Sequence, residues 1–271
     1  MFRSTRPAVS AVIWIERLSA VLAAIMALFL ILPLVGLVWR AFSLPGTAVL
    51  DQSSLASAIL LSLSTTAISV LLIFLLGTPL AYVLARYPLR GKRLLTVFIE
   101  LPIVMPPVVA GLGLLSVFGR RGLLGLPLAE LGITITFSGT AVVLAQIFVA
   151  SPFYIRAAQS RFAALPREFE DAAAVDGANR WQTFRHIMLP LSRNGLLAGL
   201  ILSWARALGE FGATILFAGN LQGSTQTMPL LVYASLERDL RITFITALIL
   251  LALAVVAFGV TRWLTGLDAI E

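Results

Sequence analysis

The charged side chains with the most chemical meaning in this sequence are Arg206 and Glu210, which lie inside the apolar stretch 195–219. Their spacing of four residues places them on one face of a helix, where an arginine and a glutamate can pair. Charged groups in a membrane-spanning segment are rare, and they usually pair with one another or line a polar path. The sequence leaves both interpretations open: an ion pair that fixes packing, or groups that face a path or a partner near a gate.

The residue types that the chain lacks exclude many other chemistries. There is no cysteine, which excludes disulfides, thiol nucleophiles and cysteine-ligated metals. His186 is the only histidine and Lys92 the only lysine, and both lie between apolar segments. A multi-histidine metal site and a serine–lysine dyad inside a span are therefore excluded, which disfavours an intramembrane enzyme. No Gly-x-x-x-x-Gly-Lys-Ser/Thr sequence occurs, so the chain has no phosphate-binding loop of that type.

Six long apolar segments must position these residues. Apolar residues make up 59% of the 271 residues and charged residues 12%, about half the charge of a soluble domain. A helix of about 20 apolar residues crosses the hydrocarbon core of a membrane. The first segment is longer than the apolar core of a signal peptide, so we interpret it as a retained span. The six predicted spans are residues 18–39, 59–85, 94–118, 135–155, 195–219 and 242–261.

The basic residues between these segments predict the orientation. With the N-terminus inside, fourteen of the 20 basic residues fall on the cytoplasmic side and five fall outside. We therefore expect an all-α protein of the cell inner membrane, a single domain over residues 1–271 with six transmembrane helices and both termini in the cytoplasm. The net charge of +7 mostly flanks the spans, next to membrane lipid, so it does not indicate binding to nucleic acid.

The third predicted span contains three prolines, Pro102, Pro106 and Pro107, which remove backbone donors and predict a broken helix. A broken helix at membrane depth is tolerated where it lines a cavity or is buried in protein. A helix that restarts after Pro107 would direct its positive N-terminal end toward the membrane interior and favour an anion there. A simple packing kink is the alternative interpretation.

The fifth predicted span carries a stripe of small residues, Gly195, Gly199, Ser203 and Ala207, as at close helix contacts. Gly199 precedes Arg206 by seven residues and therefore also shares its face. The predicted pathway or gate accordingly includes the three prolines of the third span together with Gly199, Arg206 and Glu210.

The longest predicted cytoplasmic segment, residues 156–194, begins with the pattern of a short helix. Pro166 and the acids at 168, 170 and 171 suit a first helical turn, because acids there complement the helix dipole. The alanines at 172–174 favour helix, and Gly177 lies where a glycine commonly ends one.

A second short helix is expected from residue 179 to about residue 188, with Pro190 ending it. Its apolar residues recur at helical spacing, so one face is apolar. Two interpretations remain: a solvated connector or headgroup-bound helix, and a surface on which another protein docks. The adjacent alanines favour docking, since a small, flat surface permits close approach.

The spacing within this segment resembles a motif of ATP-binding cassette (ABC) importer permeases. The family pattern is Glu-Ala-Ala, three residues, Gly, nine residues, Ile, one residue, Leu-Pro, and the chain departs from it only by Asp171 in place of the glutamate. The resemblance implies a type I importer permease fold, in which this segment is a coupling helix that docks on a separate ATPase subunit. It implies that two copies of that ATPase bind the ATP and Mg, with no cofactor in this chain. The residues implied in coupling are Glu170, Asp171, Ala172, Ala173, Asp176, Gly177, Ile187, Leu189 and Pro190.

Further stretches resemble permeases of the molybdate and tungstate importer group. They are residues 205–214, 219–220 and 225–230, and 101–107 followed by 118–122. This resemblance adds Gly209 and Thr227 to the predicted pathway and implies a tetrahedral oxyanion, delivered by an extracytoplasmic binding protein to a permease homodimer. Sulfate and thiosulfate permeases are the close alternative. A secondary transporter is the more distant one, but it would often show inverted repeats, and none is visible.

Overall fold

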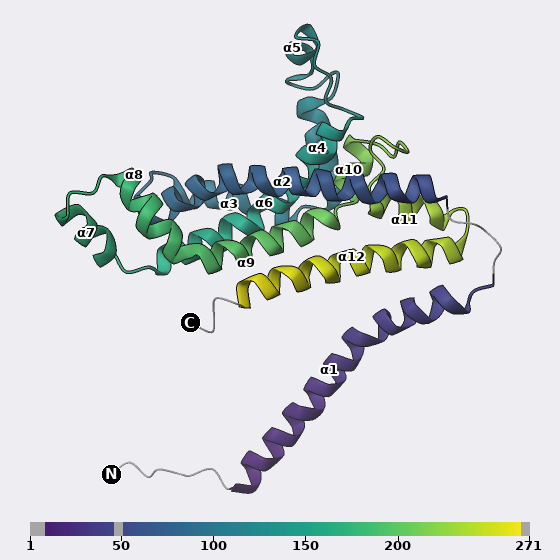
Figure 1. Ribbon diagram of the computed structural model, residues 1–271, viewed down its shortest axis with the longest axis horizontal. Helices are drawn as coiled ribbons and strands as arrows, with labels where there is room; N and C mark the ends of the chain where they lie inside the picture. The colour runs from purple at the N-terminus through teal and green to yellow at the C-terminus, as the bar shows by residue number, and fades with distance from the viewer. Residues whose placement is uncertain (1–8, 46–50, 267–271) are drawn as a thin grey trace.

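The computed structural model describes residues 9–45 and 51–266, which form helices and short connections without a strand among them (Figure 1). The helices are α1 (Val9–Ser43), α2 (Gln52–Arg86), α3 (Lys92–Val104), α4 (Pro107–Phe118), α5 (Gly125–Glu130), α6 (Gly139–Ala164), α7 (Glu168–Val175), α8 (Arg180–Thr183), the π-helical turn η1 (Phe184–Met188), α9 (Leu189–Leu208), α10 (Gly212–Phe217), α11 (Met228–Leu236) and α12 (Leu240–Gly266).

The described helices fit a protein that crosses the membrane several times. Four stretches are long and apolar enough to span it: Glu16–Ser43, Gln52–Arg86, Gly139–Ala164 and Arg180–Leu208. The bent pair of α3 and α4 makes a fifth if it is counted as one span, and α12 contributes the shorter apolar stretch Leu240–Val256. The predicted all-α membrane architecture is confirmed. The predicted number of six spans remains a prediction, as does the side of the termini, which lie outside the described residues.

The core of the bundle lies where α6 packs between α2 and α9. Tyr154, Phe162 and Leu84 are fully buried there, with small residues such as Ala81 and Ala158 between them. Small side chains allow the helix axes to approach closely, as is typical of helix contacts in membranes. Helices α2, α6 and α9 therefore form the rigid frame of the molecule.

Helix α1 extends away from this frame over most of its length (Figure 1), and its C-terminal part packs against α12, where Leu34, Val38 and Leu251 line one pocket. Most of its apolar stretch is exposed, with large side chains such as Phe29 at 68% exposure, although Ala41 near its end is buried. An apolar helix this exposed needs lipid or another protein around it.

The third predicted span, 94–118, is broken as its prolines predict. Helix α3 ends at Val104, α4 begins at Pro107, and the two are bent by 119°. Pro106 is the N-cap of α4, whereas Pro102 lies within α3 without ending it. The helix continues past the single missing backbone donor at Pro102, but it is interrupted at the consecutive prolines 106 and 107.

The fifth predicted span, 195–219, is not the continuous helix that its composition suggests. Helix α9 ends at Leu208 and α10 begins at Gly212, so the prediction of one helix here is wrong. Figure 1 shows α4 and α10 side by side, leaving the bundle at a steep angle.

The predicted loop 156–194 is also shorter than expected. Helix α6 continues to Ala164, and the second short helix does not end at Pro190 but runs through η1 into α9. In η1 the N–H of Leu189 reaches the carbonyl of Phe184, five residues back. This wider turn immediately precedes Pro190, whose ring and missing N–H would disturb a regular α-helical ladder.

Candidate functional site

The segment formed by α7 and α8 protrudes from one end of the bundle (Figure 1). Glu168, Glu170 and Asp171 occupy the first turn of α7, as predicted, and Gly177 follows the helix with a φ of 82°. This left-handed conformation suits glycine and turns the chain toward α8. Asn179 then caps α8 in a reciprocal pair of hydrogen bonds with Gln182. The local sequence thus determines a helix, a tight turn and a second helix.

The surface of α7 is a mixture of small, acidic and apolar side chains. Asp171, Ala172 and Asp176 are exposed, whereas Ala173 is buried at 4% exposure. Val175, which the sequence analysis did not select, is 87% exposed and is the most prominent apolar group of this helix. Of the remaining predicted coupling residues, Gly177 and Pro190 are exposed, and Ile187 and Leu189 are partly buried.

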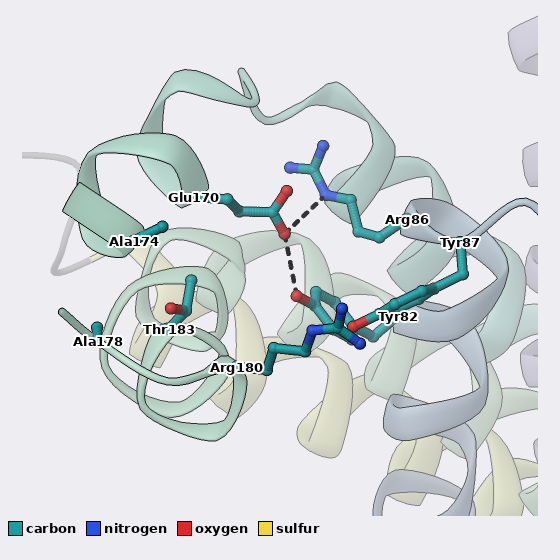
Figure 2. A pocket seen from close by; sticks show the side chains of 8 residues that line it. All are labelled: Tyr82, Arg86, Tyr87, Glu170, Ala174, Ala178, Arg180 and Thr183. Carbon is teal, nitrogen blue, oxygen red and sulfur yellow. Dashed lines mark hydrogen bonds and ion pairs between the residues drawn. The ribbon is translucent and has the colours of Figure 1, made fainter.

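Glu170 differs from the other acids of α7 because it points inward, toward the end of α2 (Figure 2). Its Oε1 accepts a hydrogen bond of 3.0 Å from the hydroxyl of Tyr82 and lies 3.6 Å from Nε of Arg86. Arg86 also donates a bond of 2.9 Å from Nη2 to the carbonyl of Leu165. These groups border a cavity of about 220 Å³, which Arg180 and Tyr87 also line. Nothing in the local sequence could predict this cluster, because Tyr82 and Glu170 are 88 residues apart.

The break between α9 and α10 is built around Glu210. Its Oε1 accepts a 2.8 Å hydrogen bond from the N–H of Ala213, and its Oε2 lies 2.8 Å from Nη2 of Arg206. The side chain of Glu210 is 1% exposed and that of Arg206 is 29% exposed. The carboxylate therefore pairs with the predicted partner and also satisfies a free backbone donor at the start of α10.

The two broken spans meet at their breaks. A Cβ added to Gly212 would lie 2.5 Å from Cβ of Pro107, and one added to Gly111 would lie 2.9 Å from Cβ of Leu216. Glycine is therefore required for α4 and α10 to pack this closely. The structure brings Pro106, Pro107 and Glu210 into one region, and it adds Gly212, which the sequence analysis missed.

Two other predicted pathway residues lie in helix contacts. A Cβ on Gly199 would be 2.9 Å from Cβ of Ala157, so this glycine packs α9 against α6. Thr227 is buried at the N-terminus of α11, next to Met228, whose N–H donates to Oγ of Ser62 over 2.8 Å. Gly209 is the C-cap of α9. Among the described residues, no three His, Asp or Glu side chains gather as a metal site would require.

The opposite end of α2 carries a second polar cluster, around Asp51. Hydrogen bonds from Ser54 and Ser53 lower the pKa of Asp51 to about 2, because they stabilise the ionised carboxylate at the helix N-terminus. Gln222 and Arg238 line a cavity of about 180 Å³ beside it.

Comparison with known proteins identifies the class of this arrangement. Residues 77–266 match the family described as "Binding-protein-dependent transport system inner membrane component". The chain is 41% identical over 233 residues to the molybdenum transport system permease protein ModB of Mycobacterium tuberculosis, covering 86% of this chain and 88% of that one. It is 39% identical to ModB of Escherichia coli (78% and 93% covered) and 42% identical to the sulfate transport system permease protein CysW of Synechococcus elongatus (68% and 64% covered).

Solved structures share the fold at low identity. A bacterial ABC transporter that imports alginate superposes with a TM-score of 0.74 at 17% identity, covering 93% of this chain and 95% of that one. The MetNI methionine ABC transporter, in an inward-facing form, gives 0.63 at 17% identity, with 80% and 96% covered. The predicted ABC importer permease fold is confirmed. The chain belongs to the family of binding-protein-dependent transport system inner membrane components.

Proposed function

We propose that this chain is the permease subunit of an ABC importer that carries molybdate or tungstate across the inner membrane. The observation that carries this proposal is its identity of 41% over 86% of its length to a protein named as a molybdenum transport permease. The substrate is a tetrahedral oxyanion, and a separate ATPase supplies the energy.

The shape and composition of α7 support the docking of that ATPase. The helix lies at the end of the bundle, and its exposed alanine and valine offer a small apolar surface bordered by acids. We assign this end to the cytoplasm, where two copies of the ATPase bind the nucleotide. Glu170 faces α2, so the surface offered to the ATPase consists of the outward residues, Asp171, Ala172, Val175 and Asp176.

The two breaks support a path that opens and closes without holding the anion tightly. Arg206 is the partly exposed cation there, and Glu210 forms an ion pair with it that weakens its field. A doubly charged oxyanion would therefore meet a weak positive field and would be released readily. The binding protein on the outside supplies the selectivity and delivers the oxyanion.

The exposed apolar side chains of α1 and α4 support assembly of two copies of this chain. Phe29 and Leu112 are exposed on these helices, at 68% and 52%. A second copy, related by a two-fold axis, would cover such surfaces and enclose a path between the subunits.

The substrate is tested in proteoliposomes that hold the complete complex of this chain with its ATPase and its binding protein. We expect ATP-dependent accumulation of molybdate and tungstate, with sulfate at least tenfold less effective at equal concentration. Accumulation of sulfate instead would favour the alternative that the similarity to CysW raises. Accumulation without ATP would reject the ABC mechanism in favour of a secondary transporter.

A further inference from the structure

The cluster around Arg86 joins three elements at one end of the bundle. Arg86 belongs to the last turn of α2 and contacts Glu170 of α7 (Figure 2). It also donates to the carbonyl of Leu165, just after α6. Tyr82, one turn earlier on α2, donates to the same Glu170 oxygen. Helix α7 is thus held to α2 by side chains and to α6 by the chain itself.

The charged side chains of this contact are largely shielded from solvent. The side chain of Arg86 is 6% exposed and that of Glu170 is 24% exposed, although both belong to the polar end of the bundle. A buried guanidinium needs a charged partner and hydrogen-bond acceptors, because its desolvation is otherwise uncompensated. Separating the two side chains would leave Arg86 with the carbonyl of Leu165 as a partner but without an opposite charge, so we expect Arg86 and Glu170 to move together.

The position of α2 gives the contact a consequence for the whole molecule. Helix α2 packs along α6 and also against α9, and its other end carries Asp51 beside the second polar cavity. A displacement of α7 that moved α2 would therefore shift residues at both ends of the bundle. Packed side chains and ion-pair networks of this kind carry coupling between distant sites.

We propose that Arg86 and Glu170, together with Tyr82, are positioning residues that transmit movement of α7 to α2. The inference rests on the proposed function, in which a motor subunit displaces α7. Glu170 acts inward as the connection to α2. The surface offered to the motor consists of Asp171, Ala172, Val175 and Asp176.

The test compares Glu170→Gln and Arg86→Gln with Glu168→Gln, a matched control on the same helix whose side chain is exposed. Each variant is assembled with its ATPase and binding protein in proteoliposomes, and both oxyanion uptake and ATP hydrolysis are measured. We expect the uptake per ATP hydrolysed to fall roughly 2- to 30-fold for the two cluster variants and to stay unchanged in the control. The double variant should be no worse than either single variant, because the two residues act as one contact.

Several results would overturn the inference. A normal uptake per ATP hydrolysed in Glu170→Gln would overturn it. So would a double variant whose loss equals the product of the losses in the two single variants. If the glutamine variants fail to assemble, Tyr82→Phe decides, because it removes one hydroxyl and leaves the ion pair. Reduced coupling in that variant supports the inference, and normal coupling rejects it.

Failure of the proposed substrate gives a different pattern. A wild-type complex that hydrolyses ATP but accumulates no molybdate would reject that substrate alone. The inference is then tested by measuring ATP hydrolysis with and without the binding protein. Hydrolysis by the Glu170→Gln complex should no longer depend on the binding protein, whereas hydrolysis by the Glu168→Gln complex should still depend on it. Equal dependence in both variants would reject the inference.

Discussion

Glu210 shows how one side chain can serve two structural needs. Its two oxygens bind different groups, the N–H of Ala213 and the guanidinium of Arg206. The sequence predicts the ion pair from the spacing of four residues, but it gives no direct sign of the backbone bond. The second bond exists only because the helix breaks between Leu208 and Gly212.

The double role of Glu210 predicts the effects of its substitution. Glu210→Ala should lower the free energy of unfolding by about 1–3 kcal/mol, since a buried donor and a partly buried cation lose their partner. Glu210→Gln should lose less, because its amide oxygen can still accept from Ala213. Exchanging the charges at 206 and 210 should not restore stability, because an arginine cannot accept that bond. Thermal unfolding in detergent checks this, with the exposed Glu130→Ala as control, and full recovery by the exchange would contradict it.

Asp51 predicts a pH dependence at the other end of α2. Its pKa in the folded state, about 2, lies below its ordinary value of 3.8 because Ser54 and Ser53 donate to the carboxylate. A lowered pKa stabilises the fold above pH 3.8, and this contribution is lost as the pH falls toward 2. Asp51→Asn can still cap the helix but does not titrate. The difference in Tm between wild type and Asp51→Asn should therefore shrink between about pH 5 and pH 2, and a constant difference would contradict the assignment.

At the scale of elements, the sequence predicts long helices better than their interruptions. Apolar length predicts the helices of the frame, and the consecutive prolines predict the break before Pro107. The break at Gly209 was missed because two glycines and a glutamate can also belong to a continuous helix. The capping bond of Glu210 is what makes the interrupted form stable, and that bond is visible only in three dimensions. The clusters around Arg86 and between α4 and α10 join distant segments, so no local pattern could indicate them.

The contact between α4 and α10 should be sensitive to one added carbon. Gly212→Ala places a Cβ 2.5 Å from Pro107, so one of the two helices must shift. We expect a destabilisation of about 1–3 kcal/mol and reduced uptake. Gly113→Ala is the matched control on α4, since its added Cβ meets no atom within 4 Å. Equal stability and uptake of the two variants would contradict the close contact.

The turn after α7 should tolerate only residues that accept its backbone conformation. Gly177 has a φ of 82°, and an added Cβ would meet open space, so the cost of substitution comes from the backbone alone. Gly177→Ala should cost about 1–2 kcal/mol and misplace α7, whereas Gly177→Asn should be milder, because asparagine visits this conformation more readily. Uptake per ATP hydrolysed compares the two, and an equal loss would argue against a backbone cause.

At the scale of the whole molecule, the chain is a rigid frame with three projecting parts. The α7–α8 segment extends at one end, the paired α4 and α10 leave the side, and most of α1 extends away from the frame (Figure 1). Each projecting part exposes large apolar side chains, which are unfavourable in water. The architecture is that of a subunit, and the proposed motor, second copy and surrounding lipid account for these surfaces.

The central claim is that this bundle transports only when a separate ATPase acts on it through α7. The most direct measurement is molybdate accumulation in proteoliposomes that hold the chain alone, compared with those that hold the chain, the ATPase, the binding protein and ATP. The account predicts accumulation against a gradient in the complete system and none with the chain alone. Uphill accumulation by the chain alone would contradict it.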